Sequence, residues 1–100
     1  MEDFLAINIT RQLNIESGGR ASTATLCIKS LERDPIKNRW VCLWSLEHLC
    51  SRGIALGQDP IEALTNVIKL IGLFINGTEI DGINIWWKQK GDNGGFPILR

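Results

Sequence analysis

The segment GIALGQDPIEALTNVIKLIG, residues 53–72, constrains the fold most because several independent signals in it mark the start of one helix. Asp59 stands at the N-cap position, where a side-chain oxygen accepts from the first-turn amides. Pro60 follows at the first helical position, which suits its fixed φ angle. Glu62 completes a capping box. The sequence therefore predicts a helix that begins at Asp59 and runs to about Ile75.

The apolar positions of this predicted helix run around most of its circumference. One stripe contains Ile61, Leu64, Ile68, Ile71 and Ile75, and a second contains Ala63, Val67, Leu70 and Phe74. A stripe of about 100° is enough to dock a helix on one sheet, and this one is wider. Two interpretations stay open: the C-terminal segment folds over the spare flank, or the flank forms a homodimer seam or receives a partner.

Strands are predicted on both sides of the helix from apolar residues that alternate with polar ones. The segments are Leu5–Ile15, Ala21–Leu31, Arg39–Cys50, Gly53–Leu56 and Ile83–Trp87. Within the first, Arg11 interrupts the alternation and is expected to mark a bulge or an edge. We expect one α+β domain over residues 1–100, in which an antiparallel meander of three to five strands packs against one long helix, with a C-terminal strand.

Charge and composition narrow the class of protein. Eleven basic and eleven acidic residues give a formal net charge of zero, which argues against a nucleic-acid partner. The N-terminus lacks the features of a secretory signal. The stretch Ile61–Ile75 is expected to be too short and too polar to span a bilayer. Three cysteines cannot all pair in one chain and suit a reducing compartment. A cytoplasmic protein without a membrane partner is the expectation.

Catalytic and metal-binding candidates are few. His48 and Cys50 would share a strand face with Cys42, and Cys27 would lie across the sheet, but no Cys-x-x-Cys spacing announces a metal site. A nucleophilic thiol would need an orienting acid such as Glu47, which points the other way on a regular strand. We expect no enzyme activity, metal or cofactor. The alternative is a small enzyme or ligand-binding protein with a pocket between helix and sheet that uses Cys42 and His48.

The two consecutive tryptophans Trp86 and Trp87 are the strongest candidates for recognition. Neighbouring residues of a strand face opposite sides, so one indole is expected in the core and the other at solvent, a dimer seam or a partner. Tryptophan is also enriched among interface hot spots. The predicted partner-binding residues are Trp86, Trp87, Lys88, Lys90, Asp92 and Asn93. The alternative is that the second indole lies flat over the spare flank of the helix.

The stretch GIALGQDPIEALTNVIKLI resembles the strand-turn-helix segment of HicB-type antitoxins, in which a glycine-bounded strand leads to a polar turn and an EAL helix start. The chain departs from that family in its tryptophan-rich terminal strand and in having no appended DNA-binding segment, so operator binding is not implied. With its WWKQKGDNGGFP ending, the whole chain also looks like small uncharacterised bacterial domains that behave as immunity proteins. These resemblances imply a noncatalytic protein that neutralises a toxin by covering its active or substrate-binding surface.

Overall fold

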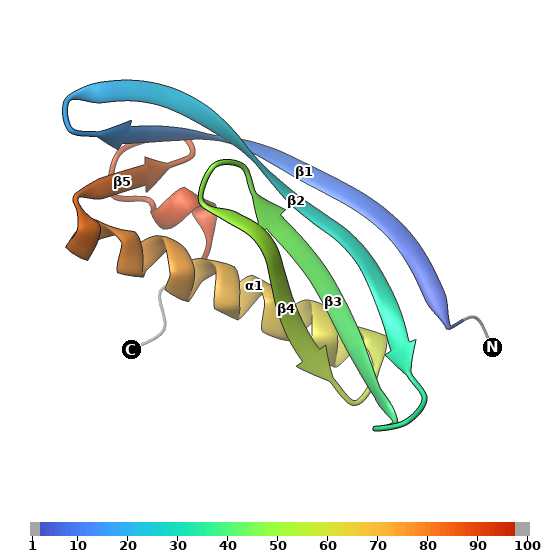
Figure 1. Cartoon of the computed structure of the whole chain (residues 1–100). Helices are drawn as coiled ribbons and strands as arrows, with labels where there is room; N and C mark the ends of the chain where they lie inside the picture. The colour runs from blue at the N-terminus through green and yellow to red at the C-terminus, as the bar shows by residue number, and fades with distance from the viewer. Residues whose placement is uncertain (1–2, 98–100) are drawn as a thin grey trace.

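The computed structural model describes residues 3–97 and contains one antiparallel sheet and one long helix. The strands are β1 (Phe4–Ser17), β2 (Arg20–Asp34), β3 (Arg39–Leu46), β4 (Cys50–Gly57) and β5 (Ile83–Trp86). The helix α1 (Pro60–Gly77) is followed by the 3₁₀ turn η1 (Thr78–Asp81), and a second turn, η2 (Asn93–Gly95), follows β5. The sheet order is β4-β3-β2-β1-β5 (Figure 1). The predicted α+β class is confirmed, although η2 and its flanking loop follow the last strand.

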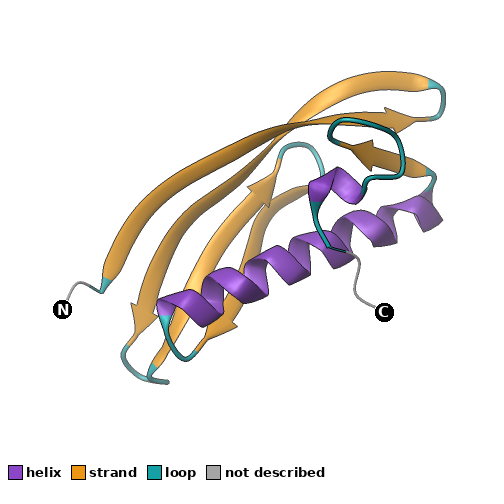
Figure 2. Cartoon of the chain, turned by 180° about the vertical axis from the view of Figure 1, so that it is seen from behind, coloured by secondary structure: helices purple, strands orange, loops and turns teal. Residues whose placement is uncertain are grey.

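The sheet curls, and α1 lies along its concave face (Figure 2). The core forms there from alternate residues of the strands and one stripe of the helix. It contains Leu13, Ile15, Ala24, Leu26, Ile28, Leu31, Trp40, Cys42, Trp44, Leu46, Ala55, Ala63, Val67, Ile71, Ile75 and Ile85. Four strands form a continuous meander, and β5 returns to pair with the C-terminal half of β1 after the helix has crossed the sheet.

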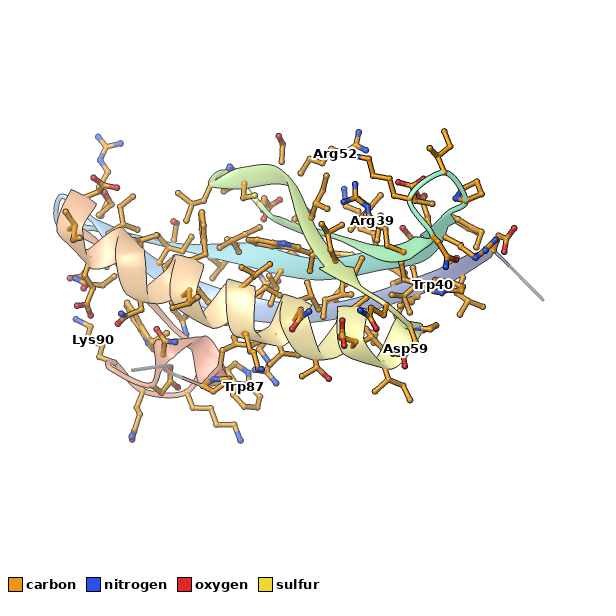
Figure 3. The ribbon with its side chains drawn as sticks, turned by 90° about the horizontal axis from the view of Figure 1, so that it is seen from below. Arg39, Trp40, Arg52, Asp59, Trp87 and Lys90 are labelled. Carbon is orange, nitrogen blue, oxygen red and sulfur yellow. The ribbon has the colours of Figure 1, made fainter. Side chains whose placement is uncertain are left out.

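The start of α1 agrees with the capping signals in the sequence. The Asp59 carboxylate accepts from the Glu62 amide at 2.7 Å. The Glu62 carboxylate accepts from the Gln58 amide at 3.0 Å, one residue before the cap. The helix continues to Gly77, two residues beyond the predicted end, because η1 follows without an extended break. Asp59 therefore fixes the end of α1 that lies next to β4 (Figure 3).

The prediction of one strand over Arg39–Cys50 is wrong. β3 ends at Leu46, and a turn follows in which His48 has a φ of 71°. Cys50 instead begins β4, which is longer than the predicted Gly53–Leu56 strand. Alternation of side chains cannot reveal such a turn, because residues on both sides of it keep an apolar pattern. As a result, His48 does not share a strand face with Cys42.

The bulge of β1 lies near Asn8 and not at Arg11, where the sequence pattern predicts a bulge or an edge. The register between β1 and β2 shifts between Ala6 and Ile9, where Asn8 has a φ of 57°. Arg11 is paired in register with Leu26 and faces the concave side. Asparagine tolerates this left-handed conformation better than most residues, so the bulge falls at Asn8.

Gly53 allows the buried Trp44 ring of β3 to lie across β4. A Cβ atom at Gly53 would stand 2.1 Å from Cε2 of the Trp44 ring, which is far inside van der Waals contact. On its other side the Trp44 ring meets Phe74 edge to face, with centroids 5.6 Å apart. The glycine that opens the GIALG stretch is therefore a packing requirement.

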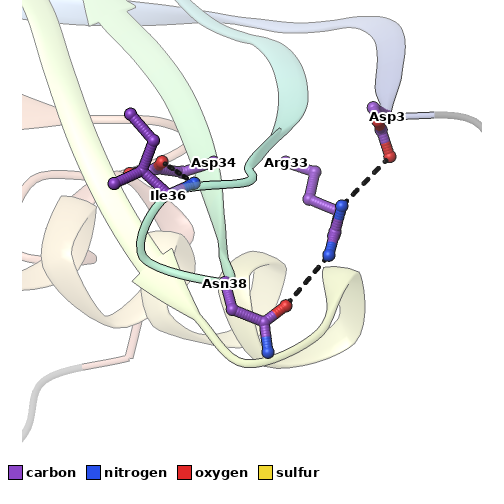
Figure 4. A network of polar contacts seen from close by, with 5 residues as sticks. All are labelled: Asp3, Arg33, Asp34, Ile36 and Asn38. Carbon is purple, nitrogen blue, oxygen red and sulfur yellow. Dashed lines mark hydrogen bonds and ion pairs between the residues drawn. The ribbon is translucent and has the colours of Figure 1, made fainter.

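The turn between β2 and β3 is held by hydrogen bonds from side chains to nearby backbone and between two side chains (Figure 4). Asp34 Oδ1 accepts from the amides of Ile36 and Lys37 at 3.1 and 3.3 Å. Arg33 donates to Asn38 Oδ1 at 3.0 Å. The hydrogen bond from the backbone amide of Lys37 is the main cause that lowers the pKa of Asp34. These contacts fix the far end of the sheet from the tryptophan pair.

One helical stretch, Pro60–Asp81, is long and apolar enough by length and composition to cross a membrane. The expectation for Ile61–Ile75 concerned a shorter segment, which ends before η1. In the fold, one face of the stretch is buried against the sheet, through Ala63, Val67 and Ile71. Such docking is that of a core helix, and the compact domain is consistent with a soluble protein.

Candidate functional site

The end of β5 turns its two tryptophans to opposite faces of the sheet, as predicted for neighbouring strand residues. Trp86 pairs with Asn14 of β1, and its half-buried indole lies on the convex side. Trp87 lies on the concave side and is 36% exposed. The side chain of Asn14 donates to the Trp87 carbonyl at 3.0 Å, which fixes the strand end. Neither indole joins the central core cluster.

Trp87 belongs to a stack of cations and aromatic rings. The guanidinium carbon of Arg11 lies 3.8 Å from the Trp87 ring centroid and 5.1 Å from that of Phe96. Arg11 also donates to the Gly94 carbonyl at 3.0 Å. The ammonium of Lys88 lies 4.4 Å from the Trp87 centroid. Trp87 therefore connects β1 to the C-terminal loop.

Trp86 forms a second aromatic and cationic pair, near a cavity. The ammonium of Lys90 lies 5.2 Å from the Trp86 ring centroid and 3.1 Å from a carboxylate oxygen of Glu16. A cavity of about 180 Å³ opens between the end of α1, β5 and the following loop. Its lining includes Trp86 and Lys90 together with Asn76, Glu79 and Asn84. Carboxylate, ammonium, amide and indole groups thus meet at one place.

Asp92 organises the loop that carries these residues. Its carboxylate accepts from the amides of Trp87, Lys88, Gln89 and Gly94 at 2.8–3.1 Å. Burial raises the pKa of Asp92, but these four bonds together lower it below its ordinary value. A carboxylate that accepts several backbone N–H bonds is stabilised in its charged form. Asp92 therefore holds the loop in shape.

Asn93 likewise serves the fold of the loop. Its side-chain amide donates to the carbonyls of Gly72 and Phe96, at 3.0 and 3.3 Å, and the residue is buried. Of the six predicted partner-binding residues, Trp86, Trp87, Lys88 and Lys90 present side chains near the surface, whereas Asp92 and Asn93 are engaged within the loop. Figure 3 shows Lys90 at the end of the molecule opposite Asp59, with Trp87 between the two.

Sequence reasoning did not select Arg11, Asn76, Glu79 or Asn84 as site residues. A charged residue among apolar ones on a strand is a signal that another segment folds over it, whereas the interrupted alternation at Arg11 predicts a bulge or an edge. Asn76 directly follows the predicted end of the helix at Ile75. The short connection through η1 brings it and Glu79 beside β5.

The spare flank of α1 is covered on one side only. The C-terminal segment crosses the helix at Gly72, where an added Cβ would lie 2.3 Å from the Pro97 carbonyl oxygen. On the other side Leu70 and Leu73 stay 40% and 46% exposed. The prediction that the C-terminal segment covers the flank thus holds for half of it.

The thiol candidates do not form a catalytic set with the predicted geometry. Cys42 is fully buried, and burial raises the pKa of its thiol to about 11. His48 lies on the turn after β3, where its Nε2 atom is 3.9 Å from Glu47, so Glu47 does not point away from it. Cys27 and Cys50 line the same shallow groove as His48. Within residues 3–97 no group of three or more potential ligands is placed to hold a metal ion.

A comparison with protein families matches residues 9–98 to one family, described as Domain of unknown function (DUF6968). The chain belongs to this family. The DUF6968 match spans most of β1, all later elements and the tryptophan loop, so it treats sheet, helix and loop as one unit. Comparisons with curated proteins and with solved structures found no match.

Proposed function

We propose that this DUF6968 protein is a noncatalytic protein-binding module that acts by covering a surface of its partner. The observation that carries the proposal is the placement of the Trp86 indole on the convex side, beside Lys90 and a cavity of about 180 Å³. Aromatic anchors next to pockets and rimmed by polar groups are typical of interface hot spots. The four hydrogen bonds that the Asp92 carboxylate accepts from backbone amides also support the proposal, because they hold the loop in one shape before binding.

A toxin is the partner class we propose, with the protein acting as an immunity or antitoxin-type protein in the cytoplasm. The proposal rests on the resemblance of the GIALGQDPIEALTNVIKLI segment and on a binding surface that needs no chemistry of its own. The burial of Cys42 and its raised pKa support a noncatalytic mode of action. The three free thiols support a reducing compartment.

The test begins with capture of partners by the tagged full chain from its own host cell, followed by purification of each captured protein. Titration calorimetry then compares the wild type with Trp86→Ala. The variant should weaken binding by about 30-fold or more, since truncation of a hot spot costs about 2 kcal/mol or more. If the partner is a toxin, co-expression with the wild type should also restore growth, and co-expression with Trp86→Ala should restore less.

The matched control is Ile36→Ala, which truncates a 91% exposed apolar side chain at the far end of the sheet. Its affinity should equal that of the wild type. Circular dichroism must show both variants folded. Equal affinity of Trp86→Ala and wild type would overturn the assignment of the site. Detection of a chemical change that the protein makes in its partner would overturn the noncatalytic function.

A further inference from the structure

A second surface lies at the other edge of the sheet from β5. Within the described residues no strand pairs with the outer side of β4. The Leu56 carbonyl accepts from the Asn66 side chain at 2.7 Å, so the backbone of Leu56 points away from β3. Because strand residues alternate in direction, the backbone N–H and C=O of Ile54 point outward as well. This edge can form hydrogen bonds with another strand.

Apolar side chains flank this edge on both faces of the sheet. Ile54 and Leu56 lie on the convex face and are 48% and 40% exposed. On the concave side, Asn66, Leu70 and Leu73 lie on one face of α1, because they are spaced four and three residues apart. The hydrogen bond from the Asn66 side chain to the Leu56 carbonyl places this face beside β4. A groove of about 440 Å³ between Leu49, in the turn just before β4, and Leu73 of α1 continues the surface. We call Ile54, Leu56, Leu70 and Leu73 the β4 seam.

The second half of the β4 edge lacks the features that normally protect a free strand. From Gly53 to Gly57 it has no charge, no proline and no bulge, whereas the register shift and the charge of β4 lie before it, at Ser51 and Arg52. At the opposite end of the sheet β5 is also unpaired on its outer side, but it has only 4 residues, and a very short strand is a poor template for pairing. The N-terminal half of β1, which β5 does not cover, is interrupted by the bulge near Asn8. A bulge twists an edge away from regular pairing. The stretch Gly53–Gly57 of β4 is therefore the edge best suited for adding a strand.

Charge at the two ends of β4 favours a second copy of this chain as the occupant. Arg52 stands near the start of the strand, whereas Asp59 and Glu62 follow its end (Figure 3). In an antiparallel pair about a two-fold axis, the start of one strand meets the end of the other. Arg52 of one copy would then lie toward the acidic first turn of α1 in the other.

We propose that β4 pairs antiparallel with β4 of a second copy about a two-fold axis at Ile54, and that the two β4 seams close against each other on both faces of the sheet. The pairing joins two five-stranded sheets into one. It uses the edge opposite β5, so it is independent of the proposed function at Trp86, and either can fail without the other.

Sedimentation equilibrium of the full chain at micromolar concentration tests the proposal. The wild type should sediment at roughly twice 11.2 kDa. Leu70→Lys and Ile54→Lys each place a charge in the β4 seam and should shift the species to monomer while circular dichroism stays native. Ile54→Pro should do the same, because it removes an outward N–H that β3 does not use.

Ile36→Lys is the matched control, since it adds the same charge to an exposed isoleucine away from β4, and it should stay dimeric. Arg52→Glu should weaken the dimer by repulsion from Asp59 of the other copy. A wild type that stays monomeric at 100 times the initial concentration would overturn the proposal. So would folded Leu70→Lys and Ile54→Lys variants that remain dimeric, or a wild type that forms species larger than a dimer.

Discussion

The Arg11 guanidinium of β1 lies 3.8 Å from the Trp87 ring centroid, although 76 positions separate the two residues in the chain. The contact stacks a cation on an indole at the place where β5 ends and the C-terminal loop begins. The same guanidinium lies 5.1 Å from the Phe96 ring centroid. A charge that would be costly on an apolar concave face is thus satisfied by the segment that folds over it.

Replacement of Arg11 by alanine should loosen this loop from the sheet. We expect the free energy of unfolding to fall by about 1–2 kcal/mol, because a cation–π contact and a hydrogen bond are both lost. Urea denaturation measures the change. Arg20→Ala, at the exposed turn between β1 and β2, is the control and should change it by less than about 0.5 kcal/mol. Equal effects at the two positions would contradict the stacking role of Arg11.

Gly53→Ala should destabilise the protein by about 1–3 kcal/mol, because the new methyl group must displace the Trp44 ring. Gly77→Ala is the matched control. A Cβ there meets nothing within 4 Å, and the residue ends α1 with a negative φ, so the substitution should be neutral or stabilising. Thermal melts of both variants provide the comparison. A Gly53→Ala protein as stable as the wild type would show that the Trp44 ring has another place to lie.

The helix start was predictable from sequence because its signals are local. Asp59, Pro60 and Glu62 act on amides within one turn of themselves, so their order in the chain is nearly sufficient to fix the geometry. The strands were predictable where alternation is regular, as in the buried residues Ala24 and Leu26 of β2. In both places the residues that form the sequence pattern are the same residues that make the stabilising contacts.

The turn at His48 and the site around Trp86 depend instead on tertiary placement. A turn with apolar residues on both sides leaves no break in the alternation of Arg39–Cys50, and only the pairing of β3 with β4 reveals it. The roles of Asp92 and Arg11 depend on the path of the chain after β5. No spacing in the sequence indicates that four amides converge on Asp92.

Asp59→Ala should lower the free energy of unfolding by about 0.5–2 kcal/mol, because the Glu62 amide loses its acceptor. Guanidinium denaturation measures the loss. Asp59→Asn keeps an oxygen at the cap and should retain most of the stability. An alanine variant with an unchanged denaturation midpoint would contradict the capping role.

Cys42 should resist alkylation in the native protein, because burial both blocks access and raises the pKa of its thiol to about 11. Iodoacetamide at pH 7.5 should modify the half-buried Cys27 and Cys50 first, as mass spectrometry of the peptides would show. Denatured protein is the control, in which all three thiols should react alike. Rapid native labelling of Cys42 would favour the alternative of a thiol-dependent enzyme.

Acid should release the tryptophan loop through Asp92. The pKa of its carboxyl is lowered in the fold, so its contribution to stability is present above the unfolded-state value of about 3.9 and is lost as the pH falls through the folded-state value. The amide NMR signals of Trp87 and Lys88 should therefore move toward those of a loosened loop below about pH 4. They should stay constant between pH 5 and 7.

Asp92→Asn separates this titration from general acid unfolding. An asparagine side chain offers one acceptor oxygen in place of two, so it can keep two of the four amide bonds at most and does not titrate. Its loop should be looser than that of the wild type at pH 7 and should change little down to pH 3. Asp34→Asn is the control: it removes a carboxyl of lowered pKa from the distant β2–β3 turn and should leave the Trp87 transition where it is. A Trp87 signal that follows the Asp34 substitution instead would show that the transition reports the whole sheet and not the loop.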